Sequence, residues 1–245
     1  SAEKIEHNLH GIMDELAQFL DFDCQQPAIL VNNYDWMTEW DYLTFLRDVG
    51  KHFPVNGMLA KESVKARIEQ TEAGMSYTEF SYMLLQAYDF VHLRKAYGCS
   101  LQVGGSDQWG NITAGIELGR RMGEGTLHGL TCPLLTKSDG SKMGKTEQGA
   151  IWLSAEKTSP YAFYQYWFNT DDADVDKCLR LLTELPEDEI ATLAEDRTAH
   201  PQNRRSQQQL AESLTLLVHG QQGLESARKA SEVLFGAAIA EMSDA

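Results

Sequence analysis

Hydrophobic residues recur at helical spacing in several segments of the first hundred positions. The segments for which this pattern favours a helix are residues 3–20, 41–52, 61–70 and 78–97. The second should end before Pro54, because the residue ahead of a proline disfavours helical torsions. The fourth has a capping-box pair, Ser76 and Glu79, at its start and Gly98 as a stop signal at its end.

Short apolar runs lie between and after these helical segments and predict strands, of which we expect the first two to be buried. The runs are residues 28–31, 99–103 and 130–136. Turn-forming residues follow the first two runs, and after the second a further helix should extend to about Met122. Because strands alternate with helices, we expect an α/β fold with a parallel sheet in this part of the chain.

Beyond Trp152 the strand signals stop and the pattern is helical throughout. The prolines that begin or interrupt the expected helices are Pro160, Pro186 and Pro201. This change predicts a domain boundary near residue 154. Residues 1–153 would form the α/β domain and residues 154–245 an all-helical domain.

Composition narrows the class of protein further. The 245 residues are 42% hydrophobic, which suffices for a sizeable core, and the net charge of −15 argues against a non-specific nucleic-acid binder. The longest apolar run, residues 234–240, is far shorter than a membrane span. No zinc or redox spacing links the four cysteines, so we expect reduced thiols in a cytoplasmic protein. The first methionine is Met13, so we expect the numbered chain to begin inside a longer protein.

One face of the helix predicted over residues 78–97 carries polar groups. Tyr82, Gln86 and Asp89 are spaced i, i+4 and i+7, which places them within about 60° of one another around the helix axis. They would offer a phenol, an amide and a carboxylate to a ligand. A solvated face of an ordinary amphipathic helix explains the same spacing.

Residues 104–108, Gly-Gly-Ser-Asp-Gln, join a predicted strand to a helix. Paired glycines let a ligand approach the backbone, and the helix start presents free amides. Nucleotides bind at this position in open α/β sheets, and Asp107 could accept hydrogen bonds from a ribose. The alternative is a tight turn without a ligand.

The polar loop over residues 137–149, here called the lysine loop, contains three glycines and three lysines. Lys142 and Lys145 form a pair of ammonium donors that could neutralise charge on a polyphosphate. A solvated surface loop is the alternative.

These groups together resemble one family. Lys-Met-Gly-Lys-Thr, residues 142–146, resembles the KMSKS signature of class I aminoacyl-tRNA synthetases. The other segments that look like the bacterial-type tyrosyl-tRNA synthetases are residues 32–36, 45–48, 82–89 and 104–111. Two alternatives remain open: a tryptophanyl-type synthetase, which shares the architecture, and a synthetase-like RNA-binding module without catalysis.

The resemblance implies a Rossmann-like catalytic domain with a helical connecting insertion, followed by a helical domain that contributes to anticodon recognition. It implies ATP-dependent activation of tyrosine and transfer of the tyrosyl group to tRNA(Tyr). Mg²⁺ would accompany the ATP, and no metal would be bound tightly by the protein. Neither DNA nor a membrane is an expected partner.

The resemblance also implies roles for single residues at the tyrosine site. Tyr82 and Gln86 would hold the amino group of tyrosine, and Asp89 would accept a hydrogen bond from its phenol. Gln108 would contact the substrate carboxylate and the transition state. These four positions would form part of the amino-acid pocket.

The nucleotide site would be formed by residues from two loops. Gly105 and Asp107 would contact the ribose of the adenylate. Lys142 and Lys145 would contact the pyrophosphate in the transition state, with Thr146 in support.

Two further regions would contact partners. Arg120 and Arg121 would meet the tRNA acceptor end, although cations at a helix C-terminus are also favoured by the helix dipole alone. Tyr77 and residues 41–68 lie where the family forms a homodimer, although the same residues could instead belong to an intramolecular core.

One part of the family pattern is not matched. The His-x-Gly-His signature, which helps to bind ATP, belongs upstream of residue 1, and residues 7–10 do not supply it because no glycine lies between their histidines. The C-terminal RNA-binding module is not matched either. We therefore expect about half of the catalytic site here, and no adenylate formation by these 245 residues alone.

Overall fold

The computed structural model describes residues 2–70, 74–140, 143–146 and 149–235. The chain divides into two compact units: Leu30–Leu135, and Ser1–Ile29 together with Thr136–Ala245. Each is described by itself. The predicted domain boundary near residue 154 lies inside the second unit and stays a prediction. Within the described ranges, every helix is too short or too polar to cross a membrane.

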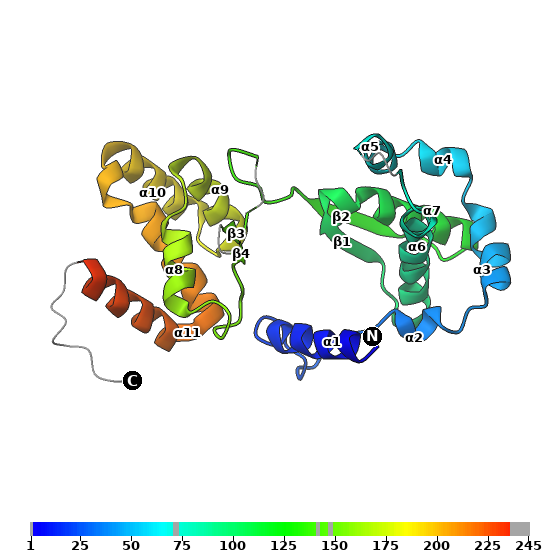
Figure 1. The fold of residues 1–245 in the computed structure, drawn as a ribbon, viewed down its shortest axis with the longest axis horizontal. Coiled ribbons are helices and arrows are strands. Elements are labelled where there is room, and N and C mark those ends of the chain that lie inside the picture. Colours follow the sequence, from blue (N-terminus) through cyan, green and yellow to red (C-terminus); the bar gives the residue numbers. More distant parts are fainter. Residues whose placement is uncertain (1, 71–73, 141–142, 147–148, 236–245) are drawn as a thin grey trace. The chain divides into compact units, whose positions relative to one another are not determined.

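The unit of residues 30–135 is built on a strand–helix–strand motif (Figure 1). Strand β1 (Leu101–Gly105) leads through a short 3-10 turn, η2 (Ser106–Gln108), into helix α7 (Trp109–Met122), and strand β2 (His128–Cys132) follows. The strands pair in parallel, from Leu101 opposite His128 to Gly105 opposite Cys132. A parallel pair needs such a crossover connection. The α/β class predicted from the sequence is therefore confirmed.

Helix α6 (Tyr77–Tyr97) packs on α7 and begins and ends as its sequence predicts. Ser76 caps its start: the Ser76 hydroxyl accepts from the Glu79 amide, and the Glu79 carboxylate accepts from the Ser76 amide. At the other end Gly98 takes a left-handed conformation with φ of 70°. Glycine adopts that conformation without the penalty other residues incur.

Among the described residues of this unit, four further helices precede α6. They are α2 (Tyr34–Met37), α3 (Tyr42–Asp48), α4 (Val55–Leu59) and α5 (Glu62–Gln70), with a 3-10 turn, η1 (Gly50–His52), after α3. Asp41 caps α3 by accepting from the Thr44 amide at 3.0 Å. The helices predicted over 41–52 and 61–70 are thus present, and the first ends before Pro54.

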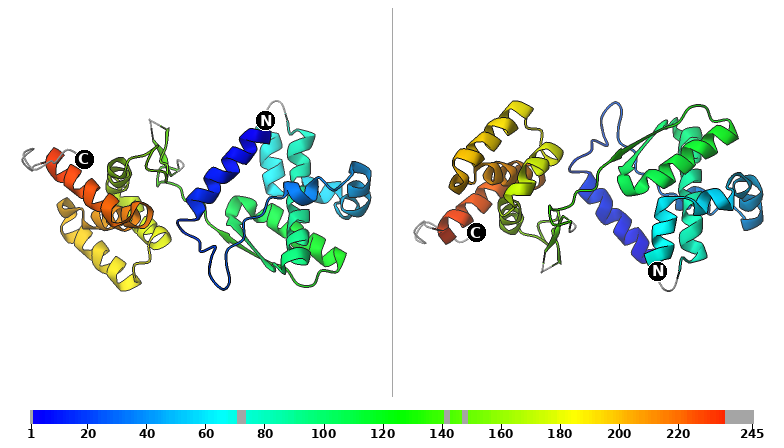
Figure 2. Two further views of the ribbon diagram at one scale, coloured as in Figure 1. Left: turned by 90° about the horizontal axis from the view of Figure 1, so that it is seen from below. Right: turned by 90° about the horizontal axis from the view of Figure 1, so that it is seen from above.

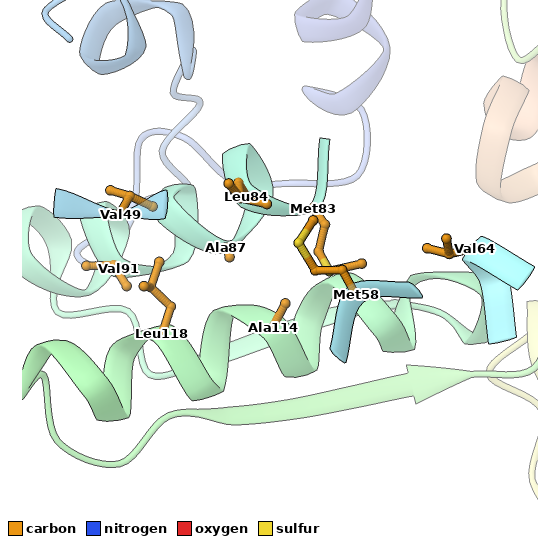
Figure 3. Packing of buried hydrophobic residues seen from close by; sticks show 9 residues of the cluster. All are labelled: Val49, Met58, Val64, Met83, Leu84, Ala87, Val91, Ala114 and Leu118. Atoms are coloured by element: carbon orange, nitrogen blue, oxygen red, sulfur yellow. The ribbon is translucent and has the colours of Figure 1, made fainter. Parts of the chain in front are cut away.

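The hydrophobic core of this unit lies between α6, α7 and the helices that precede them. Figure 3 shows nine of its buried side chains: Val49, Met58, Val64, Met83, Leu84, Ala87, Val91, Ala114 and Leu118. Three of these, Leu84, Ala87 and Val91, lie on the face of α6 opposite Tyr82 and Asp89, so α6 has the two-faced character that its sequence predicts.

The second unit is mainly helical. Its elements are α1 (Ala2–Leu16), two-residue strands β3 (Lys145–Thr146) and β4 (Gly149–Ala150), α8 (Pro160–Phe168), α9 (Asp172–Leu182), α10 (Glu187–Ala199), η3 (Pro201–Asn203) and α11 (Arg205–Phe235). Both views in Figure 2 show α8 to α11 grouped into one bundle. Helix α11 packs against α8, α9 and α10, and Gly220 interrupts it with φ of 68°. The helix starts and stops predicted at the prolines are confirmed.

Two predictions about the strands are wrong. Residues 28–31 were expected to form a strand, but in the structure they form no β-ladder, and the Ala28 amide donates instead to the Asp21 carbonyl. The strand predicted over residues 99–103 was expected to be buried, yet Leu101 and Val103 are 48% and 58% exposed, as is Leu130 of the paired strand at 53%. The reason is that α7 covers one face of the β1–β2 pair, and these side chains lie on the other face.

The capping box of α6 generates a prediction about acid stability. Hydrogen bonds from the Ser76 amide, Arg67 and the Ser76 hydroxyl lower the pKa of Glu79 from 4.5 to about 2. A carboxyl whose pKa is depressed by folding stabilises the fold above its unfolded pKa and loses that effect as pH falls. The unfolding free energies of the wild type and Glu79→Gln should therefore converge between pH 4.5 and 2 in chemical denaturation. Parallel pH profiles of the two proteins would contradict the capping role.

Candidate functional site

The Asp89 carboxylate on α6 is held by two donors from a distant part of the sequence. The Trp36 indole nitrogen donates to Oδ1 at 2.8 Å, and the side-chain amide of Asn33 donates to Oδ2 at 3.1 Å. Each carboxylate oxygen can accept more than one hydrogen bond, so acceptor capacity remains for a ligand. Asp89 is thus an oriented acceptor on a rigid helix.

Aromatic stacking holds the Trp36 side chain, one of the two donors, in place. Trp36 is buried, and its ring lies on that of His92, with centroids 4.4 Å apart and planes 13° apart. The turn before α2 is closed by the Asn32 side chain, which accepts from the Tyr34 amide at 3.0 Å. The sequence placed a turn at residues 32–35 but gave no indication that Asn33 and Trp36 bind Asp89, since more than fifty residues separate the partners.

Tyr82 and Gln86 share the α6 face with Asp89. Tyr82 is 55% exposed and Gln86 is half-buried. The face is therefore open to solvent beside an anchored carboxylate, as a binding surface requires.

The turn after β1 has a compact geometry, with side chains packed against Gly105. A Cβ atom at Gly105 would lie 2.5 Å from Asp107 Oδ1 and 3.0 Å from Leu134 Cδ2, so a larger residue would require the Asp107 side chain to move. Beside it, the side-chain amide of Gln108 donates to the Asp107 carboxylate at 3.0 Å. The side-chain amide of Asn111 donates to the side-chain oxygen of Gln108 at 3.3 Å. The structure thus joins Asp107 and Gln108 into one polar chain at the start of α7.

The two arginines at the end of α7 form ion pairs with one glutamate. Arg120 and Arg121 each approach Glu117 at 2.7 Å, and their hydrogen bonds lower the pKa of Glu117 to about 2. Arg121 also donates to the His52 carbonyl at 2.9 Å. Arg120, with its side chain 69% exposed, remains the more accessible cation.

The lysine loop is described only in part. Lys142 lies outside the described residues, and Lys145 and Thr146 are described by their backbone, which forms β3 opposite Ala150 and Gly149. The Gly144 amide donates to the Tyr166 hydroxyl at 2.8 Å. Among the residues that the structure describes, no three His, Cys, Asp or Glu side chains are placed to hold a metal ion.

Comparisons with known proteins agree with these features. The family model for class I tRNA synthetases (W and Y) matches residues 1–236. The chain is 55% identical over 244 residues to the tyrosine–tRNA ligase of Rhodopirellula baltica, covering 100% of this chain and 56% of that protein. It is also 56% identical over 236 residues to the Geobacillus stearothermophilus tyrosine–tRNA ligase, covering 96% of this chain and 56% of that protein.

A solved structure supports the same relationship. The C-terminally truncated mitochondrial tyrosyl-tRNA synthetase of Aspergillus nidulans has a TM-score of 0.70 and 34% identity, covering 83% of this chain and 57% of that chain. The chain thus spans a little over half the length of the relatives it matches. Its fold, its motifs and a match over nearly all its residues show that the chain belongs to the class I tRNA synthetases of the tryptophan and tyrosine family.

Proposed function

We propose that this chain forms part of a tyrosine–tRNA ligase, which activates tyrosine with ATP and transfers it to tRNA(Tyr). The observation that carries the proposal is the Asp89 carboxylate, oriented by Trp36 and Asn33 on the polar face of α6. The similarity to proteins named tyrosine–tRNA ligase supports the choice of amino acid over the tryptophanyl alternative.

On this proposal Asp89 recognises tyrosine by accepting a hydrogen bond from its phenol. A substrate without the hydroxyl would leave the carboxylate short of a partner, which is costly in a desolvated site. Tyr82 and Gln86 would hold the substrate amino group, and Gln108 its carboxylate. The exposed α6 face and the polar chain from Asp107 to Asn111 support these roles.

The proposed chemistry has two steps. The tyrosine carboxylate attacks the α-phosphorus of ATP, forming tyrosyl-adenylate and releasing pyrophosphate. A terminal ribose hydroxyl of the tRNA then attacks the acyl carbon and releases AMP. No side chain becomes a covalent nucleophile, so catalysis depends on positioning and on charge stabilisation.

The nucleotide would be bound through the turn after β1 and the lysine loop. Gly105 and Asp107, which lie against each other in this turn, would contact the ribose. Lys142 and Lys145, supported by Thr146, would neutralise charge on the departing pyrophosphate. Mg²⁺ would arrive bound to the phosphates of ATP and balance part of their charge.

We expect the protein to form a cytoplasmic homodimer. The tRNA would contact residues in both compact units of the chain. Exposed Arg120 is proposed to meet the acceptor end, and the helical region over residues 154–245 the anticodon side. Exposed apolar side chains on α3 and α4, among them Leu43 and Val55, support a dimer interface there. The Tyr42 and Tyr77 hydroxyls lie 3.2 Å apart at the same surface.

The first functional prediction tests catalysis in a chimera. The chain replaces the matching 244 residues of the Rhodopirellula baltica relative, and the chimera should support tyrosine-dependent pyrophosphate exchange. Lys145→Ala should lower the rate of adenylate formation by about 10²-fold or more, because a donor to transition-state charge is lost. The KM for tyrosine should change little.

Substitution of the exposed Lys4, near the start of α1, provides a matched control: Lys4→Ala should leave the rate of the chimera unchanged. A chimera without pyrophosphate exchange would refute the proposed function. So would a chimera in which Lys145→Ala has no effect on the rate of adenylate formation.

The second functional prediction concerns specificity. Asp89→Ala in the chimera should reduce the ratio of kcat/KM for tyrosine to that for phenylalanine by about tenfold or more, since a hydrogen bond to a charged group contributes about 1.5–3 kcal/mol. Asp35→Ala, an exposed aspartate on α2, is the control and should keep the ratio. Discrimination that survives in Asp89→Ala would show that another group reads the phenol.

The third prediction concerns assembly. Light scattering of the 27.5 kDa chain should give about twice that mass, since the two-fold dimer is the commonest closed oligomer. Leu43→Asp should shift the mass toward the monomer, because Leu43 is 75% exposed and the charge would be desolvated in an interface. Leu217→Asp, on α11, should leave the dimer intact. A monomeric wild type at tens of micromolar would exclude this interface.

A further inference from the structure

The lysine loop is bonded to side chains of the helical bundle near its start and at its central turn. We propose that Tyr166 of α8 and Asp174 and Lys177 of α9 are positioning residues, which hold the backbone of the lysine loop in place for the phosphate side of the reaction. This inference rests on the proposed function of that loop. All the contacts that carry it lie within one unit of the chain.

The start of the loop is held by two side chains on one face of α9. Asp174 is buried, and its Oδ2 accepts from the Ser138 amide at 3.0 Å and from the Ser138 hydroxyl at 3.3 Å. Three residues further along the helix, Lys177 donates to the Thr136 carbonyl at 3.1 Å. Residues three apart on a helix lie side by side. Asp174 and Lys177 therefore bind two nearby points of the same backbone.

The central turn of the loop is held by α8. The Tyr166 hydroxyl accepts from the Gly144 amide at 2.8 Å, and the Gly144 carbonyl accepts from the Ile151 amide at 2.9 Å. The ring of Tyr166 contacts that of Trp167 edge-on, with centroids 4.9 Å apart. This packing would keep the ring in place without the hydroxyl. Removing the Tyr166 hydroxyl should therefore affect the loop and leave the packing of the ring unchanged.

The segment that leaves the loop is held as well. The Trp152 amide donates to the hydroxyl of buried Thr158 at 3.0 Å, and the Lys157 ammonium lies 4.2 Å from the centre of the Trp152 ring. A glycine-rich loop loses much conformational freedom when it is ordered. Three anchoring points would provide part of that ordering before any ligand binds.

These anchors should affect the two substrates unequally. Gly144 is the residue next to Lys145, so its hydrogen bond to Tyr166 limits where the adjoining backbone can lie. Reactions that depend on positioning are sensitive to small displacements. Loss of the anchor should therefore slow adenylate formation, while the affinity for tyrosine, proposed to depend on α6, should be unaffected.

The first test uses the 245-residue chain and needs no activity. Tyr166→Phe removes the hydroxyl, and Tyr161→Phe removes from the same helix a hydroxyl without a hydrogen-bond partner among the described residues. Hydrogen exchange of the Gly144 amide and trypsin cleavage at the lysines of the loop should accelerate in Tyr166→Phe and not in Tyr161→Phe. Equal exchange and cleavage in both variants would overturn the inference.

The second test measures the reaction in the Rhodopirellula baltica chimera. Tyr166→Phe should lower the rate constant for adenylate formation about three- to tenfold, the effect of one hydrogen bond, at an unchanged KM for tyrosine. Asp174→Ala should act similarly, and Asp174→Asn should restore most of the rate because an amide oxygen can still accept from Ser138. An active chimera whose rate is insensitive to Tyr166→Phe overturns the inference. An inactive chimera refutes the proposed function. The hydrogen-exchange experiment on the 245-residue chain then decides by itself whether Tyr166 anchors the loop.

Discussion

The close approach of α6 and α7 determines where the polar groups of the α/β unit lie. A Cβ atom at Gly115 of α7 would lie 3.0 Å from a ring carbon of Phe90 on α6, so a larger residue would push the helices apart. On its other side α7 packs against the sheet, where a Cβ atom at Gly129 would lie 2.6 Å from Ile112. Both contacts use glycine to bring backbone near to side chains. Consequently the packed core between α6, α7 and the sheet links the polar face of α6 to the turn after β1.

The same packing explains why Asp89 is available as an acceptor. Because Ala87 and Val91 are buried against the core, the opposite face of α6 is directed away from it. A carboxylate on that face is oriented only if something holds it, and α2 provides the donors through Trp36 and Asn33. Asp89 therefore has two connected roles: it docks α2 on α6, and it is the proposed acceptor for the phenol. Its substitution should disturb both.

Local signals in the sequence predicted the elements whose ends depend on local chemistry. Helix α6 begins at Ser76 and ends at Gly98 because capping and a left-handed glycine involve only neighbouring residues. Features that depend on distant residues were not predictable in this way. Residues 28–31 have the composition of a strand, but a strand forms only when a partner satisfies its backbone groups. The hydrogen bonds from Asn33 and Trp36 to Asp89 were missed for the same reason.

The lysine loop shows how contacts between distant residues decide which compact unit a segment belongs to. Its glycines and charges are typical of a solvated loop, and the end of the strand signals placed the boundary after it, near residue 154. In the structure the segment from Thr136 onward belongs to the helical unit, because Asp174, Lys177 and Tyr166 bind its backbone. The described residues of the loop, whose lysines are proposed to bind phosphate, are then part of the unit that packs around α11. The backbone at Thr136, Ser138 and Gly144 is thus bonded to helices that follow it in the sequence.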